Sequence, residues 1–206
     1  MDTTTIILAA LLGLGLSAST GLNTFIPLLL VSAAARFNIA GIELGQKFDW
    51  LSSDTGMTVL IIAAIVEIIG DKFPAVDHLL DSAGTFVRPA AATVATAGVL
   101  TGAHVDPTIA AIAGFLIGTP AALGFHSLKA GTRVASSATT FGCANPVLSL
   151  IEDIVSLAFS VLAIFAPILV PIALLLIGLV LWRIVKRTRR AAQQSGAAGF
   201  SPPNIR

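Results

Sequence analysis

Three basic side chains lie along the sequence at spacings that place them on one face of a helix. His126, Lys129 and Arg133 are separated by three and four residues, and these spacings bring side chains to the same helical face. A helix that begins near Pro146 would direct its free N–H groups and the positive end of its dipole toward the same region. This arrangement predicts a site for a carboxylate or phosphate group.

A polar segment follows these cations, between two apolar stretches. Residues 136–146 are rich in Ser, Thr, Gly and Asn. Non-helical backbone at membrane depth is tolerated where it lines a cavity or is buried in protein, because lipid cannot hydrogen-bond to it. We therefore expect Thr139, Thr140 and Asn145 to contribute to a substrate or ion site.

Four carboxylates form a second group of candidate functional residues. Glu67 precedes Asp71 by four residues on one helical face, and Glu152 and Asp153 follow the start of the fifth predicted span. Carboxylates inside a membrane are costly and usually face a bundle interior or water. Because burial and nearby cations set the proton affinity of a carboxyl group, we expect Glu67 and Glu152 to carry a coupled proton.

Both groups of residues also have a purely structural interpretation. The cations fit ordinary cytoplasmic-loop residues that set topology or contact lipid headgroups. The acids fit ion pairs across the bundle that serve assembly alone, such as Glu152 with Arg133, or Asp71 with Lys72 or Arg88.

The composition indicates that a membrane positions these side chains. Apolar residues make up 55% of the 206 positions and charged residues only 11%, whereas soluble domains have about a quarter charged residues. A transmembrane helix needs about 20 mostly apolar residues. We expect an all-α polytopic transmembrane domain over residues 1–190 and a disordered tail over residues 191–206. Six spans fit, at residues 5–35, 56–70, 83–103, 107–125, 147–164 and 168–182.

Basic residues after Trp182 predict the orientation. Cytoplasmic loops carry an excess of Lys and Arg, and the last span is followed by Arg183, Lys186, Arg187, Arg189 and Arg190. Six spans then place both termini in the cytoplasm and the turn at residues 102–106 outside. We expect an integral protein of the bacterial inner (plasma) membrane.

Polar residues and Pro27 interrupt the first predicted span. Proline removes a helical hydrogen bond, so we expect a kink or break here, with Asn23 facing the protein interior. Residues 139–146 would be the counterpart in the second half. Three spans per half would form an inverted repeat, and transporters bind substrates at such paired breaks. A second similarity, between residues 78–85 and 126–132, does not fit this pairing.

Several function classes have no support in the sequence. It contains no nucleotide-binding loop, zinc-protease motif or hydrolase nucleophile motif, so we expect no enzyme activity and no cofactor. Cys143 is the only cysteine, which excludes an intramolecular disulfide and a cysteine-based zinc site. We expect no metal and no nucleic-acid partner. Closely spaced small residues such as Gly114 and Gly118 predict close helix packing and are compatible with a homo-oligomer.

Four motifs occur in order along the hydrophobic region: Gly21–Pro27, Asp71–Pro74 with Asp77 and His78, Lys129–Arg133, and Thr139–Asp153. With these motifs, the chain resembles the small bacterial and plastid membrane proteins grouped as the domain of unknown function DUF4126. The resemblance implies a polytopic helical protein. It implies no activity, substrate or catalytic residue.

The sequence favours a small transporter for an anionic solute. The expected site joins Lys129, Arg133 and Asn145 to the break at residues 23–27, with proton coupling through the buried carboxylates. A protein that binds or flips an anionic lipid such as a polyprenyl phosphate is the main alternative, because cations at headgroup depth suit that ligand equally. An ion channel and a non-transporting scaffold are further alternatives.

Overall fold

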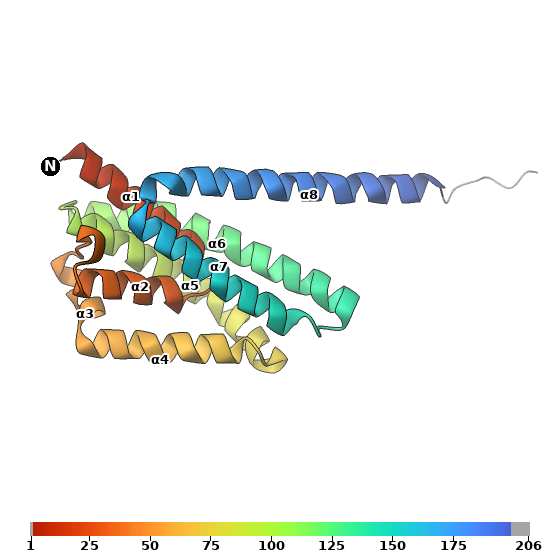
Figure 1. The fold of residues 1–206 in the computed structure, drawn as a ribbon, viewed down its shortest axis with the longest axis horizontal. Helices are drawn as coiled ribbons and strands as arrows, with labels where there is room; N and C mark the ends of the chain where they lie inside the picture. Colours follow the sequence, from red (N-terminus) through yellow and green to blue (C-terminus); the bar gives the residue numbers. More distant parts are fainter. Residues whose placement is uncertain (1, 199–206) are drawn as a thin grey trace, which may run out of the picture. The chain divides into compact units, whose positions relative to one another are not determined.

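The computed structural model describes residues 2–198, without the side chains of Pro74 and residues 188–198. No strand occurs in this range, which confirms the all-α prediction. The chain divides into two units, residues 1–170 and 171–206, so the expected domain over residues 1–190 stays a prediction. The helices are α1 (Thr3–Thr20), α2 (Phe25–Arg36), α3 (Asp49–Ser52), α4 (Asp54–Gly70), α5 (Pro74–Gly102), α6 (Pro107–Thr140), α7 (Asn145–Phe165) and α8 (Val170–Ala198) (Figure 1).

Four helical segments of the described range are long and apolar enough to cross a membrane: Thr3–Thr20, Pro107–Thr140, Asn145–Phe165 and Pro167–Arg187. The bent pair Gln46–Ser52 and Asp54–Gly70, with 58° between its parts, would make a fifth span. The protein is therefore an integral membrane protein. α8 continues to Ala198, and the expected tail beyond it, residues 199–206, lies outside the described residues.

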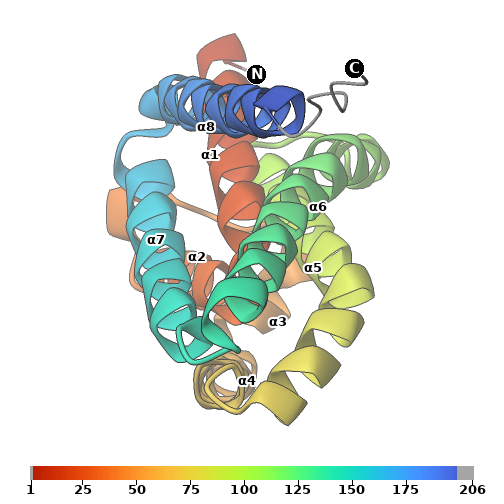
Figure 2. The same ribbon diagram turned by 90° about the vertical axis from the view of Figure 1, so that its right-hand side faces the viewer.

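α1 is the central helix of the first unit. It packs against α2, α5, α6 and α7, and along the bundle it lies between α7 on one side and α5 and α6 on the other (Figure 2). Buried hydroxyl groups join it to its neighbours: Ser17 Oγ lies 2.8 Å from Thr96 Oγ1, and Ser156 Oγ donates to Ser19 O at 3.1 Å. Such interhelical hydrogen bonds hold membrane helices together where no hydrophobic force does.

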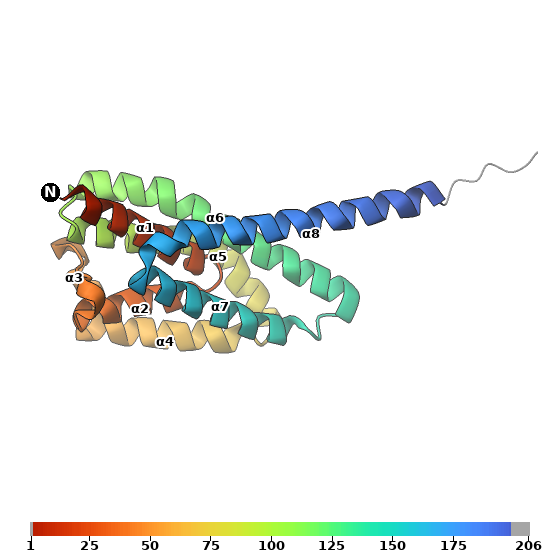
Figure 3. The same cartoon turned by 45° about the horizontal axis from the view of Figure 1, so that its top comes forward.

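The chain reverses after α1, and α2 runs back alongside it (Figure 3). Residues Gly21–Thr24 form the connection, so the expected break is present and Asn23 is fully buried. α2 has 12 residues, about 18 Å at 1.5 Å per residue, which is shorter than the apolar core of a bilayer. The crossing expected over residues 5–35 is therefore a helical hairpin. Pro27 lies in the first turn of α2, where its missing N–H breaks no helical hydrogen bond.

The reversal also changes the expected topology. A cavity at one end of the bundle is lined by the start of α1, the end of α5, the end of α7 and residues 40–43. The start of α1 thus shares this end with the turn at residues 102–106, which the six-span topology places on the opposite side. The difference arises because α1 and α2 together return to the end where α1 began.

The second polar segment forms no broken helix. α6 continues to Thr140, and residues 141–144 make a short turn into α7 in which Phe141 and Gly142 have positive φ angles of 54° and 81°. Both this turn and the Gly21–Thr24 connection reverse the chain in the same direction (Figure 1). They do not have the opposed orientation that an inverted repeat requires.

Candidate functional site

The break between α1 and α2 is capped from two directions. Asn23 Oδ1 accepts hydrogen bonds from the N–H groups of Phe25 and Ile26 at 3.1 and 3.0 Å. The Glu67 carboxylate of α4 accepts from Thr24 N at 2.8 and 3.0 Å, from Thr24 Oγ1 at 2.9 Å and from Phe25 N at 3.2 Å. The positive end of α2 therefore holds a buried carboxylate, the charge that a helix N-terminus favours.

Cations occupy the carbonyl side of the same break. Arg88 Nη1 donates to Gly21 O at 3.1 Å, and Lys129 Nζ donates to Leu22 O at 3.2 Å. Arg88 Nη2 also lies 3.5 Å from Glu67 Oε1. The free N–H groups of the break thus meet a carboxylate, and its free carbonyl groups meet cations. These bonds explain how an unwound segment is tolerated in the bundle interior.

Lys129 and Arg133 form the centre of an ionic cluster. Lys129 Nζ lies 2.7 Å from Asp71 Oδ2 and 3.5 Å from Glu152 Oε2. Arg133 Nη2 lies 2.9 Å from Glu152 Oε2 and 3.4 Å from Asp71 Oδ2, and its Nη1 pairs with Asp77. The predicted shared face of α6 is confirmed, and so is the ion pair between Glu152 and Arg133. Asp71 pairs with Lys129 and Arg133 in place of the expected Lys72 or Arg88.

Lys72 and Asp153 form a further ion pair next to the break. Lys72 Nζ is 3.0 Å from Asp153 Oδ2 and donates to Ser149 Oγ at 2.7 Å. Asn23 Nδ2 donates to Asp153 Oδ1 at 2.9 Å. Asn23 therefore connects the N-terminal end of α2 with Asp153 of α7.

His126 belongs to the site through Arg88. Arg88 Nη1 lies 2.5 Å from His126 Nδ1, and His126 Nε2 lies 3.3 Å from Thr85 Oγ1. An arginine only donates, so Nδ1 accepts and the ring proton of a neutral imidazole resides on Nε2. His126 thus holds Arg88 against the break.

The cluster contains more carboxylates than cations. Four cations (Lys72, Arg88, Lys129 and Arg133) meet six carboxylates, an excess of two negative charges when every acid is ionised. Three buried polar atoms of the cluster have neither a hydrogen-bond partner nor an ion-pair partner: Asp71 Oδ1, Arg88 Nε and Arg133 Nε. Buried uncompensated charge is costly, so positive charge added at this site would be stabilising. The six carboxylates are Glu67, Asp71, Asp77, Asp81, Glu152 and Asp153.

Three predicted site residues lie apart from this cluster. Thr139 and Thr140 donate back to carbonyl groups of α6 at 2.8–3.2 Å, and Asn145 Nδ2 donates to Ser137 Oγ at 3.2 Å. These bonds stabilise the end of α6 and the turn after it. The other predicted residues gather around the break: Asn23, Pro27, Glu67, Asp71, His126, Lys129, Arg133, Glu152 and Asp153.

Several residues of the cluster were not among the predicted site residues. Arg88 is fully buried, and its signal in the sequence is a single cation within an apolar stretch, where ionisable residues are functional candidates. Asp77 and Asp81 are four apart on α5, a spacing that places both on the face of Arg88. Thr24 has no such signal, because its role depends on the approach of Glu67.

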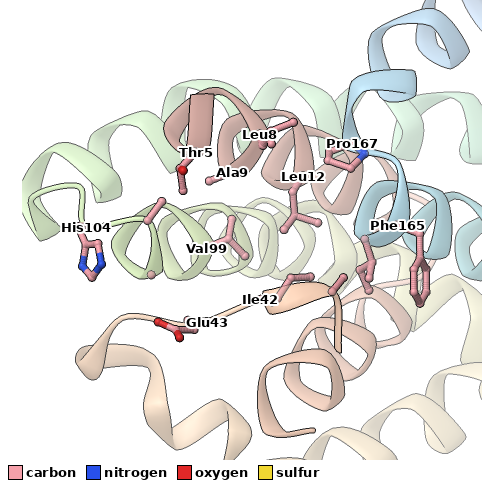
Figure 4. A pocket seen from close by; sticks show the side chains of 15 residues that line it. Thr5, Leu8, Ala9, Leu12, Ile42, Glu43, Val99, His104, Phe165 and Pro167 are labelled. Atoms are coloured by element: carbon pink, nitrogen blue, oxygen red, sulfur yellow. The ribbon is translucent and has the colours of Figure 1, made fainter. Parts of the chain in front are cut away.

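The cavity near the start of α1 lies at the end of the bundle opposite to the ionic cluster (Figure 4). Its volume is about 450 Å³, and its polar lining includes Thr5, Glu43 and His104. None of the predicted site residues lines it. The described residues contain no group of His, Cys, Asp or Glu side chains that could hold a metal ion.

The fold and the site define a polytopic α-helical membrane protein with a helical hairpin at α1 and α2 and a buried ionic cluster. Over residues 10–187 the chain matches the family described as a domain of unknown function (DUF4126), and it belongs to that family. The match includes the break and every member of the cluster. Comparisons with curated proteins and with solved structures found no match.

Proposed function

We propose that this protein is a small membrane transporter that moves an anionic solute together with a proton, and that the Gly21–Thr24 break is its binding site. The observation that carries the proposal is the Glu67 carboxylate at the N-terminal end of α2, bonded to the N–H groups of Thr24 and Phe25. This is a site for an anion. The Glu67 side chain occupies this site, and protonation of its carboxylate would remove the negative charge.

Replacement of the Glu67 carboxylate by a solute anion would couple the binding of the anion to the binding of a proton. A proton on Glu67 would cancel its attraction to the end of α2 and to Arg88, 3.5 Å away. A solute anion could then take its place and meet the same N–H groups, with Arg88 from α5 and Lys129 from α6 as the facing cations. One anion and one proton would bind together, and the net charge of the site would not change.

Lys129 and Arg133 are already paired with carboxylates. This pairing supports coupled binding of an anion and a proton over binding of an anion alone to free cations. Each cation already contacts two or more carboxylates, so an added anion would have to displace an acid or arrive with a proton. We also propose that the charged end of the bundle faces the cytoplasm of a bacterial plasma membrane, because cytoplasmic ends carry the excess of Lys and Arg.

Proteoliposomes that enclose a pH-sensitive dye test the proposal. Ethanesulfonate is a suitable probe because it is permanently charged and does not cross lipid as a neutral acid. An inward ethanesulfonate gradient should acidify vesicles that contain the wild type. Glu67→Gln should abolish this acidification, because the proton carrier is lost, whereas Glu43→Gln, at the other end of the bundle, should not.

Two results would overturn the proposal. One is equal acidification by the wild type and Glu67→Gln. The other is the absence of acidification by the wild type with ethanesulfonate, phosphate and sulfate alike. Ethanesulfonate uptake without proton movement would indicate a channel, and loss of stability in the variants without any anion effect would indicate a scaffold.

A further inference from the structure

An apolar groove lies directly beside Glu67. Its volume is about 360 Å³, and apart from Glu67 its lining residues are apolar. They come from the first residue of α2, from one face of α4 and from the start of α5, namely Phe25, Val59, Ile62, Ala63, Val66 and Leu80.

The groove opens on the outer surface of α4. Val59, Ile62 and Val66 are each more than half exposed, as expected for side chains that contact lipid in a membrane-spanning helix. A molecule dissolved in the bilayer could therefore reach the groove sideways, without first passing through water.

The groove and the anion site share two residues. Phe25 lines the groove and its N–H donates to the Glu67 carboxylate, and Glu67 itself lines the groove. On the α5 side of the carboxylate, Nη2 of the fully buried Arg88 lies 3.5 Å from Glu67 Oε1. A ligand that replaced the Glu67 carboxylate would thus have donors at its head and an apolar channel for the rest of the molecule.

We infer that the solute is a single-chain amphiphilic anion, with a carboxylate or sulfonate head at the N-terminal end of α2 and its alkyl chain in the groove. This inference rests on the proposed function and adds the substrate class. The groove volume is at the lower end of the range for small-molecule sites, which suits one short chain and not the two chains of a phospholipid.

Two sulfonates and two substitutions test the inference in the same vesicle assay. Octanesulfonate should reach half-maximal acidification at a concentration about tenfold or more below that of ethanesulfonate, because each buried methylene group contributes favourably. Ala63→Phe should fill the groove and abolish this preference while ethanesulfonate still acidifies the vesicles. Ile61→Phe is the matched control, since Ile61 is exposed on α4 but does not line the groove.

The outcomes separate the two proposals. Octanesulfonate partitions into the lipid equally in all samples, so a change in preference between variants reports the groove. If Ala63→Phe keeps the preference of the wild type, the inference is overturned although ethanesulfonate transport stands. If neither sulfonate acidifies wild-type vesicles, the proposed function fails and the inference with it. If Ala63→Phe is inactive with both probes, the smaller substitution Ala63→Leu is tested, and it should lower the preference for octanesulfonate over ethanesulfonate. An unchanged preference in Ala63→Leu also overturns the inference.

Discussion

Replacement of Arg133 by methionine should destabilise the protein strongly. The Arg133 side chain is only 6% exposed and lies within 3.4 Å of Asp71 and 2.9 Å of Glu152. Its removal raises the excess of buried carboxylates from two to three. Loss of one partner from a buried ion pair costs about 3–5 kcal/mol, because the other charge is left uncompensated. We expect a decrease of this size in the free energy of unfolding.

The matched control is the ion pair of Arg36 with Asp54, in which the Asp54 side chain is 91% exposed. Exposed pairs contribute about 0–1 kcal/mol, so Arg36→Met should change stability little. Reversible unfolding in mixed detergent micelles measures both variants. The double variant Arg133→Met/Glu152→Gln should recover part of the loss, with a coupling of about 0.5–3 kcal/mol. If Arg133→Met costs no more than Arg36→Met, the cluster is solvated and is not a buried network of ion pairs.

Three further predictions concern the break and the turn after α6. Gly21→Ala should lower the unfolding free energy by about 1–3 kcal/mol, because its Cβ would lie 2.4 Å from Ala122 O and 2.6 Å from Phe125 Cβ; unchanged stability would contradict this packing. Asn23→Ala should cost about 0.5–2 kcal/mol through loss of the α2 cap, and the same unfolding measurement checks it. Cys143 is exposed, so a water-soluble maleimide should label the folded protein rapidly, with Cys143→Ser as the unlabelled control; slow labelling would show that the turn is covered.

Much of the charged site follows from spacing and from the cost of burying charge. The three-and-four-residue spacing of His126, Lys129 and Arg133 defines one helical face, and α6 presents all three toward the interior. Glu67 and Glu152 lie in apolar stretches, where carboxylates are found only with partners. The existence of a buried polar centre could therefore be predicted from residue types.

Apart from the ion pair of Glu152 with Arg133, the partners of the charged residues and the path of the chain could not be predicted. The polar residues before Pro27 suit a kinked crossing and a hairpin equally, and the choice depends on Glu67, a residue more than 40 positions away. Thr140 and Asn145 have residue types that suit a cavity, yet their hydrogen bonds are local, to Ser136 and Ser137 at the end of α6. Local hydrogen bonding and ligand binding use the same side-chain groups, so the sequence does not distinguish them.

The most direct test of the account is an infrared difference spectrum, recorded as ethanesulfonate binds to the reconstituted wild type. A new C=O band of a protonated carboxylic acid is expected, because the anion replaces the Glu67 carboxylate only when that group takes up a proton. The band should be absent from Glu67→Gln and present in Glu43→Gln. Anion binding without the band, or an equal band in Glu67→Gln, would contradict the central role of Glu67.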